Sequence, residues 1–589
     1  MRFLRNVLAT IVGLVVFFGL IIMVFAIIGA ASEQEVEVEA NSVLRLELNK
    51  PIVERDTEDP FSSILLPGTN GVIGLINLRE AIKKAKNDEN IKGIYLDAGM
   101  LTTGYGTMEE IRNDLLDFKE SGKFIVSYSD IVGERGYYLN SVADEVYINP
   151  QGIIEFNGFA VEVTFIKNTL EKLGVEPQVF RVGDFKSAVE PLTRTSLSDS
   201  ARLQTQEYLG NLYEVYLQGI AETRGLEVAT LRNIADSMKV RFAGDAVQYG
   251  LATDTAYYDQ VLNVIGEKLG LEADENGTID TDNINFISLK KYEQSLENEP
   301  DEYSRNRVAV IVATGNIVNG EGEGEVIGGE TFAKEIRKAR LDDNIKAIVI
   351  RINSAGGSAL ASDIMWREIQ LAKEVKPVIA SMSDVAASGG YYMAMGCDTI
   401  VAHPNTITGS IGILGVIPNV EELLNNIGVT TDVVQTGQFS DIYNLTGPLS
   451  EFEQQIIQNQ IEEGYETFTR KAAAGRNMPL EQLLRVASGR VWSGVEAKDR
   501  NLIDVFGGLD QAIEIAVEKA KLEEGDYQVR YYPKKKTFIE ELIAELENQT
   551  STYFLKRELG LTYPYVMKLK ELEQYRGVQA RMPFEIEIK

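Results

Sequence analysis

The stretch SDVAASGGYYMAMG, residues 383–396, has an altered copy earlier in the same chain, SDIVGERGYYLNSV, residues 129–142. Both copies keep Ser-Asp at the start and Gly-Tyr-Tyr farther on, but Ser388-Gly389 of the later copy is Glu134-Arg135 in the earlier one. Sliding the sequence against itself by 254 residues extends the match far beyond this segment without a gap. The chain therefore contains two copies of one fold.

Each copy alternates short Val/Ile-rich runs, such as KAIVIRI, with longer amphipathic stretches, such as LASDIMWREIQLAKEV. This pattern is typical of βα units on a mostly parallel sheet, so the predicted class is α/β. We place an N-terminal domain at residues 45–300 and a C-terminal domain at residues 305–525, joined by the polar stretch LENEPDEYSRNR. Residues 526–589 form a tail to which the sequence assigns no role.

Composition narrows the possible classes of function. Acidic residues outnumber basic ones 88 to 58, a formal charge of −30, which argues against nucleic acid as a partner. The one Cys, Cys397, cannot form an internal disulfide, and its Met-rich surroundings favour core packing over a reactive thiol. The one His, His403, excludes sites that need two His ligands, so we expect neither a metal nor a cofactor.

The N-terminal segment has no charged residue from Asn6 to Ser32, and as a helix it exceeds the ~30 Å hydrocarbon core of a bilayer. We expect residues 1–32 to be a transmembrane signal anchor. The alternative is a cleaved signal peptide, but its apolar region should be only about 7 to 15 residues long. Arg2 and Arg5 precede the span and an acidic run follows it, which predicts a cytoplasmic N-terminus and domains across the membrane.

The two copies differ at one strand-to-helix loop. After the strand KAIVIRI the later copy has NSAGGS, residues 353–358, where the earlier copy has GMLTTG, residues 99–104. Paired glycines at a strand end let backbone N–H groups face a ligand oxygen, and the dipole of the following helix favours negative charge there. The glycine pair is therefore a candidate oxyanion hole. A plain tight turn is the alternative.

Ser388 follows the next strand and precedes two glycines, so its hydroxyl is predicted on a strand-to-helix corner with little steric cover. Such a corner suits a nucleophile, although a serine before two glycines is more often a helix N-cap. A neutral hydroxyl also needs a base. His403 is aligned with Asn149 of the other copy, which indicates a strand end or loop rather than a catalytic position.

Lys186, in GDFKSAVEP, occurs only in the earlier copy, and the later copy has Ser440 at the matched position. Each half thus lacks what the other supplies, and a Ser nucleophile with a neutral Lys base is a known variant of the catalytic triad. We expect one site within each chain, with Lys186 from the first domain and Ser388 from the second. A solvated surface lysine is the alternative.

Lys186 must lose its proton before it can act as a base. Burial under the facing domain would lower its pKa, and Asp184 and Glu190 must then point away, because a nearby carboxylate would keep the lysine charged. A hydroxyl that hydrogen-bonds the neutral amine would help. Ser410, in TITGSIGILG, is the candidate, with a turn serine beside Gly409 as the alternative.

Together, NSAGGS, DVAASGGYYMA, TGSIGILG and GDFKSAVEP resemble the long form of the signal peptide peptidase A family, also called protease IV. The resemblance extends from the N-terminal segment to about residue 525. It implies tandem ClpP/crotonase-like domains, a membrane anchor, and a Ser/Lys dyad that degrades released signal peptides on the periplasmic side of the bacterial cytoplasmic membrane. It also implies a homotetramer whose active sites line a bowl-shaped interior.

Carried over by motif, the resemblance implies that Ser388 is the nucleophile and Lys186 the general base. It places the oxyanion donors at the backbone of Gly356 and Gly389, and it assigns Ser410 to orienting the lysine. The matched motifs differ from the family at one position, where this chain has Ala in place of the usual Pro before the glycine pair. Both glycines are kept, so we expect activity.

We interpret the chain as a membrane-anchored serine endopeptidase of the cell envelope that acts on peptides. A crotonase-type acyl-CoA enzyme is the second hypothesis, since that fold also uses paired backbone N–H donors, but coenzyme A thioesters are cytosolic and these domains are predicted to be exported. A membrane scaffold in which Ser and Lys are relics is the third. The cleavage preference is not predicted.

Overall fold

The computed structural model describes Gly13 and residues 36–56, 71–273, 279–297, 304–322, 326–523, 525–534 and 578–582. Apart from Gly13, the predicted anchor at residues 1–32 lies outside these ranges, as does most of the predicted tail. Within the ranges just given, none of the helices is long and apolar enough to cross a bilayer.

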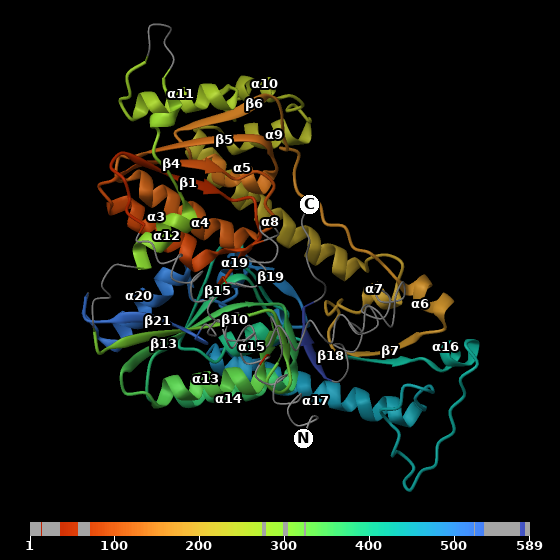
Figure 1. Cartoon of the computed structure of the whole chain (residues 1–589). Helices are drawn as coiled ribbons and strands as arrows, with labels where there is room; N and C mark the ends of the chain where they lie inside the picture. The colour runs from red at the N-terminus through yellow and green to blue at the C-terminus, as the bar shows by residue number, and fades with distance from the viewer. Residues whose placement is uncertain are drawn as a thin grey trace, which may run out of the picture.

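The first half of the chain builds a six-stranded sheet in the order β8-β6-β5-β4-β1-β9, with every neighbouring pair parallel (upper part of Figure 1). Both faces of this sheet are apolar because helices cover both, α3, α4 and α8 on one face and α11 on the other. The strands are β1 (Ser42–Glu47), β4 (Ile91–Asp97), β5 (Phe124–Val132), β6 (Glu145–Ile154), β8 (Asp254–Thr255) and β9 (Phe286–Ser288). The helices are α3 (Leu75–Asn87), α4 (Tyr105–Lys119), α5 (Glu134–Asn140), α8 (Asp199–Arg224), α9 (Val228–Asp236), α10 (Ala243–Gln248), α11 (Tyr258–Lys268), η1 (Thr281–Asn283) and α12 (Leu289–Glu297).

The second half repeats this plan with the order β19-β17-β15-β13-β10-β21, and β16 joins β15 to β20. The pairing of β17 with β19 is antiparallel and the others are parallel. The strands are β10 (Arg307–Thr314), β13 (Ile345–Ser354), β15 (Val378–Ala387), β16 (Thr399–Ala402), β17 (Ile407–Gly409), β19 (Val491–Ser493), β20 (Val505–Phe506) and β21 (Gln528–Tyr532). The helices are α13 (Gly329–Leu341), α14 (Ala359–Lys373), α15 (Gly389–Ala394), α16 (Glu421–Asn426), α17 (Glu451–Gly475), α18 (Leu480–Val486), α19 (Gly494–Asp499) and α20 (Leu509–Ala520).

The predicted repeat is visible element by element. Helices α3 and α13 both contain 13 residues, α4 and α14 both contain 15, and each pair begins 254 residues apart. Strands β4 and β13, and strands β5 and β15, start at the same offset. The α/β class with largely parallel sheets is confirmed.

A third sheet contains strands from both halves and from the C-terminal region, in the order β12-β11-β14-β22-β18-β7. Its strands are β7 (Glu176–Arg181), β11 (Asn316–Val318), β12 (Val326–Gly328), β14 (Gly356–Ser358), β18 (Leu414–Asn419) and β22 (Gln579–Arg581). Strand β7 leaves the first half together with α6 (Lys167–Leu173) and α7 (Glu190–Thr193), and it runs antiparallel to β18 of the second half (right side of Figure 1). A separate pair joins β2 (Ile52–Val53) to β3 (Ile73–Gly74). The two repeats are thus joined through a shared sheet.

Two of the predicted boundaries differ from the structure. The predicted polar linker begins inside α12, which ends at Glu297, and its last residue, Arg307, starts β10. The predicted tail begins too early, because β21 lies beyond residue 525 and pairs with β10. Half-buried aromatic residues in β21 pack on the apolar face of the second sheet, and this packing was not apparent from the sequence.

Buried charges connect the two halves. Arg351 of β13 is fully buried, and its Nη1 lies 2.7 Å from Oε1 of Glu110 on α4, while its Nε lies 3.0 Å from Oε2 of Glu54. Nη1 of Arg79 lies 2.6 Å from the other oxygen of Glu110. Burial alone would raise the pKa of Glu110, but Arg351 and Arg79 outweigh it and hold the pKa well below its usual range. The carboxylate is therefore charged and shared between the domains.

Candidate active site

Lys186 and Ser388, which are 202 residues apart in sequence, meet in the structure. The Lys186 Nζ lies 2.8 Å from Ser388 Oγ, 3.0 Å from Ser410 Oγ and 3.0 Å from the Ser410 carbonyl oxygen. All three side chains are fully buried. The structure thus brings together the predicted nucleophile, the predicted base and the predicted orienting serine.

The turn that carries Lys186 follows β7 and rests on the second half of the chain. Gly183 has a φ of 102°, and a Cβ there would lie 2.3 Å from the carbonyl oxygen of Ser488, so glycine is required. The N–H of Phe185 donates to that carbonyl oxygen at 3.2 Å, and the N–H of Asp184 donates to the Ser488 hydroxyl at 3.1 Å. These contacts direct the lysine into the second domain.

Two glycines, Gly412 and Gly489, pack closely against the Lys186 side chain. A Cβ on Gly489 would lie 2.6 Å from Lys186 Cβ, and a Cβ on Gly412 would lie 3.1 Å from Lys186 Cδ. Sequence reasoning did not single out either glycine. Gly412 lies within TGSIGILG, so a signal existed for it, whereas Gly489 lies outside the four motifs.

Burial lowers the pKa of the Lys186 ammonium well below its usual value, and no other cause of the shift is found. Asp184 is exposed, and the Glu190 carboxylate instead accepts the Ser198 N–H at 2.9 Å. The expectation that both carboxylates point away from the amine is met. Burial thus favours the neutral form of the Lys186 amine, which is the form that can act as a base.

Ser388 lies at the corner between β15 and α15 with φ 54° and ψ −111°, a conformation that non-glycine residues rarely adopt. It holds the N-cap position, but its side chain makes no capping hydrogen bond, so the N-cap alternative does not account for it. The prediction of little steric cover was wrong, because Ser388 is 0% exposed. The Lys186 turn and β22 lie beside this corner and cover it.

The glycine pair after β13 forms the short strand β14 rather than a plain tight turn. Gly356 has a φ of 105°, and a Cβ there would lie 2.8 Å from the backbone nitrogen of Gly389 and 2.1 Å from the carbonyl oxygen of Ala580. Glycine is thus needed at position 356, where the chain passes close to both Gly389 and the Ala580 carbonyl oxygen. The Gly356 N–H itself donates to the Ser354 hydroxyl at 3.1 Å, and Gly389 is the first residue of α15, so the oxyanion role of the two N–H groups stays a prediction.

In the first repeat, the corner between β5 and α5 has a glutamate, Glu134, at the position of Ser388. Glu134, which takes the place of Ser388, accepts the N–H groups of Asn157 at 2.8 Å and Gly158 at 2.7 Å through one carboxylate oxygen. Burial raises the pKa of this carboxyl, and the two backbone hydrogen bonds oppose the rise. The residue at the position matched to Ser388 therefore binds the loop at residues 157–158 of its own repeat.

His403 and Cys397 have packing roles. His403 follows β16, is buried, and its Nε2 lies 3.0 Å from Oε1 of Glu110 in the network between the halves. Cys397 is buried in the core of the second half, and burial raises the pKa of its thiol. Both predictions of non-catalytic positions agree with these contacts.

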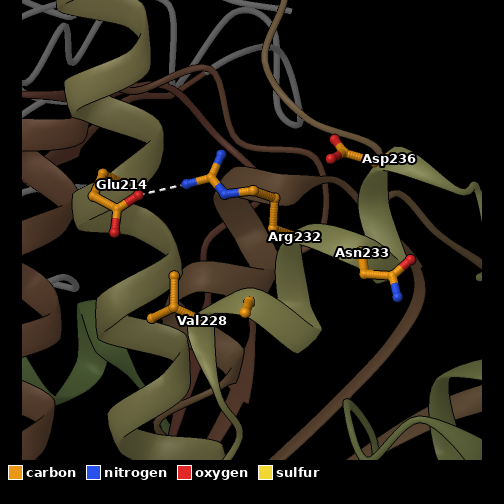
Figure 2. Close-up of a pocket in the computed structure, with 6 residues that line it drawn as sticks. Glu214, Val228, Arg232, Asn233 and Asp236 are labelled. Carbon is orange, nitrogen blue, oxygen red and sulfur yellow. Dashed lines mark hydrogen bonds and ion pairs between the residues drawn. The ribbon is translucent and has the colours of Figure 1, made fainter.

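A pocket of about 590 Å³ lies between α8 and α9 and is lined by other residues. Figure 2 shows the Arg232 guanidinium reaching from α9 to Glu214 on α8, with Asn233 and Asp236 on the far side of α9. The lining contains none of the predicted site residues and no hydroxyl or thiol. Within the described part of the chain, no group of His, Cys, Asp and Glu is arranged to hold a metal ion.

Comparison with known proteins supports this chemistry. The family model described as "Peptidase family S49" matches residues 117–272 and 370–523. "Serine protease SPPA, chloroplastic" of Arabidopsis thaliana is 38% identical over 77% of this chain and 67% of its own length. "Protease 4" of Salmonella typhi is 38% identical over 79% and 75%, and "Protease 4" of Haemophilus influenzae is 32% identical over 95% and 93%.

A solved ClpP1 mutant from Listeria monocytogenes aligns with 35% of this chain and 94% of its own at 17% identity, and its TM-score of 0.24 is too low to assign a fold. The sequence relatives, in contrast, cover most of both chains and favour a peptidase over an acyl-CoA enzyme or a scaffold. The chain is a serine peptidase and belongs to peptidase family S49.

Proposed function

We propose that this peptidase cleaves peptide bonds with Ser388 as the nucleophile and Lys186 as the general base. The observation that carries the proposal is a buried amine whose partners are two hydroxyls and a carbonyl, 2.8 Å from Ser388 Oγ. A neutral amine has one lone pair and two N–H groups. The lone pair accepts the Ser388 hydroxyl proton, and the N–H groups bind the two oxygens of Ser410, which orients the base.

In the first step Ser388 Oγ bonds to the peptide carbonyl carbon while its proton moves to Lys186 Nζ. The backbone N–H groups of Gly356 and Gly389 hold the resulting oxyanion. When the C–N bond breaks, Lys186 gives the proton to the leaving amine. Water then attacks the ester, Lys186 takes its proton and returns it to Ser388 Oγ, and the acid product leaves.

A fluorophosphonate probe tests the assignment in one gel. The full chain should be labelled and Ser388→Ala should not be. Ser440→Ala is a matched control, because Ser440 occupies the repeat position of Lys186 and is exposed to solvent. Labelling of Ser388→Ala at the wild-type rate would assign the nucleophile elsewhere.

The activity should rise with pH as Lys186 loses its proton. Burial depresses the pKa of Lys186, so the neutral base should form well below the ordinary lysine pKa of ~10.4. The profile of kcat/KM against pH for a quenched-fluorescent peptide measures this. A profile that is flat from about pH 5 to 9 would contradict a lysine base.

His403→Ala should keep most of the peptidase activity, because its ring nitrogen contacts Glu110 rather than Ser388 or Lys186. The measurement is kcat/KM together with a thermal unfolding curve, since the variant removes a buried interdomain contact. A loss of ~1000-fold or more in a folded variant would restore a His-based triad.

We further propose that the substrates include released signal peptides and that residues 1–32 anchor the chain in a bacterial cytoplasmic membrane, with both domains on the periplasmic side. The support is the long uncharged N-terminal segment and a relative, "Putative signal peptide peptidase SppA" of Enterococcus faecium, 27% identical over 47% of this chain. Sequencing of the mature N-terminus checks the anchor. A chain that begins near Ala31 would show cleavage instead.

The tandem domains are proposed to be ClpP/crotonase-like, and copies of the chain to form a ring-shaped homotetramer. Val385 and Ile407 of the second half are covered by the first half, whereas their repeat equivalents, Ile131 and Ile153, are 51% and 54% exposed. On the opposite side, Leu360 of α14 is 62% exposed. If the contact between halves recurs between chains, α14 of one chain covers Ile131 of the next, and such head-to-tail contacts close into rings.

A further inference from the structure

A short segment near the C-terminus lies in the groove beside Ser388. Strand β22 runs antiparallel to β14, with Gly357 opposite Ala580 and Ser358 opposite Gln579, and its other edge meets β18 at Leu414. The Met582 N–H donates to the Ala355 carbonyl oxygen at 2.7 Å, and the Ala359 N–H donates to the Val578 carbonyl oxygen at 3.3 Å. Residues 578–582 are therefore bound as an added strand, the mode in which many peptide-binding proteins hold an extended peptide.

The register places one carbonyl group at the reactive centre. A Cβ on Gly356 would lie 2.1 Å from the Ala580 carbonyl oxygen, and a Cβ on Gly389 would lie 3.2 Å from the same atom. Gly389 directly follows Ser388, whereas the Gly356 N–H donates to the Ser354 hydroxyl at 3.1 Å. The Ala580 carbonyl oxygen thus lies beside the residue that follows the proposed nucleophile, and Arg581 would be on the leaving side of a bond cleaved there.

We propose that residues 578–582 are a built-in substrate mimic that occupies the groove of the same chain and competes with substrates. The inference rests on the proposed roles of Ser388, Gly356 and Gly389. Because the segment belongs to the same chain, it competes at an effective concentration that does not depend on the enzyme concentration, and a free peptide must displace it before being cleaved.

The same register indicates which peptides fit. Alternate residues of a strand face one side, so Val578 and Ala580 point together into the core of the second half. Ala580 is 0% exposed and packs in the core of the second half, so a larger side chain at this position would have to displace its neighbours. Val578 lies 3.6 Å from the position of a Cβ on Gly464 and lines an apolar pocket of about 210 Å³ beside β18 and α17.

The substrate class assigned by this groove is an extended peptide with a small residue before the cleaved bond and an apolar residue two positions earlier. The pocket next to Val578 has space for a larger apolar side chain in that region. Apolar peptides with small residues near their ends meet both requirements. The expected preference comes from the groove that holds β22 and not from Ser388 or Lys186.

The test uses the full chain with Ala580→Trp, which should exclude β22 from the groove while leaving the catalytic residues unchanged. The substrate is a quenched-fluorescent peptide with the sequence of residues 576–584, RGVQARMPF. If β22 occupies the groove nine-tenths of the time, kcat/KM should rise about tenfold. The matched control is Ala229→Trp, at an exposed position on α9, which should leave kcat/KM unchanged. The same peptide with Trp in place of its Ala should be cleaved at least about a hundredfold more slowly.

Hydrogen exchange on the Ser388→Ala chain provides a readout that needs no catalysis. The amides of residues 578–582 should be protected, and Ala580→Trp should remove that protection. Exchange of these amides at the rate of an unstructured peptide, or a Ser388-dependent kcat/KM that Ala580→Trp does not change, would overturn the substrate mimic and leave the proposed function standing. Cleavage that persists in Ser388→Ala would instead overturn the proposed function.

Discussion

Ser388→Ala and Lys186→Ala should each lower kcat/KM by on the order of 10⁴- to 10⁶-fold, and the double variant should be hardly slower than either single variant. The two groups act as one unit, because the hydroxyl needs the amine as proton acceptor and the amine has no other reacting atom within 3.0 Å. Lys186→Arg should be equally inactive, since a guanidinium keeps its proton near neutral pH. Steady-state cleavage of a fluorogenic peptide measures all four variants.

The control for this series is Lys172→Ala, an exposed lysine on α6 in the same segment that crosses to the second half. It should retain activity within about twofold. Circular dichroism and thermal unfolding establish that each variant is folded. If the losses of the two single variants multiply in the double variant, Ser388 and Lys186 do not share a step.

Arg351→Met should lower the free energy of unfolding by about 3–5 kcal/mol, because it leaves Glu54 and Glu110 buried without their shared partner. The expected effect is large since Arg351 is fully buried and contacts both carboxylates across the junction of the halves. Urea denaturation of the full chain measures it. Arg470→Met is the matched control, because Arg470 and Glu466 form an exposed pair worth about 0–1 kcal/mol.

The free energy of unfolding should also fall in acid because of the ion pairs between Arg351, Arg79 and Glu110. The folded pKa of Glu110 is depressed, so its contribution to stability is present above its unfolded pKa of about 4.3 and is lost as the pH falls below that value. Arg351→Met removes a main cause of the depression and should weaken this dependence. A variant as stable as the wild type, with the same acid dependence, would show that the halves are held by other contacts.

Much of the fold and of the site was predictable, because the internal repeat and the differences between its two copies are visible in the sequence. The 254-residue offset recurs in helix after helix, so the tandem α/β plan follows from alignment of the chain with itself. Lys186 and Ser388 stood out because each is missing from the other copy. Their meeting could be inferred from that complementarity, although neither residue has an unusual neighbourhood in sequence.

The features that escaped prediction depend on contacts between distant segments. Strand β22 contains three residues, too few for a hydrophobic period, and its partner Gly357 lies over two hundred residues earlier. Arg351 sits in the run KAIVIRI, which predicts a buried strand but not its partners, 241 and 297 residues away in the other half. The burial of Ser388 likewise depends on distant segments, because the Lys186 turn and β22 cover it.

The division of the dyad between two repeats has a consequence for biosynthesis. A chain that emerges from the ribosome presents the lysine-bearing repeat first, and that repeat has Glu134 at the position matched to Ser388. Partners 202 residues apart make contact late in folding, because the loop between them must close before the contact is gained. If Lys186 and Ser388 have the proposed roles, the site is incomplete until β7 has joined β18, and completion of folding would itself be the activation step.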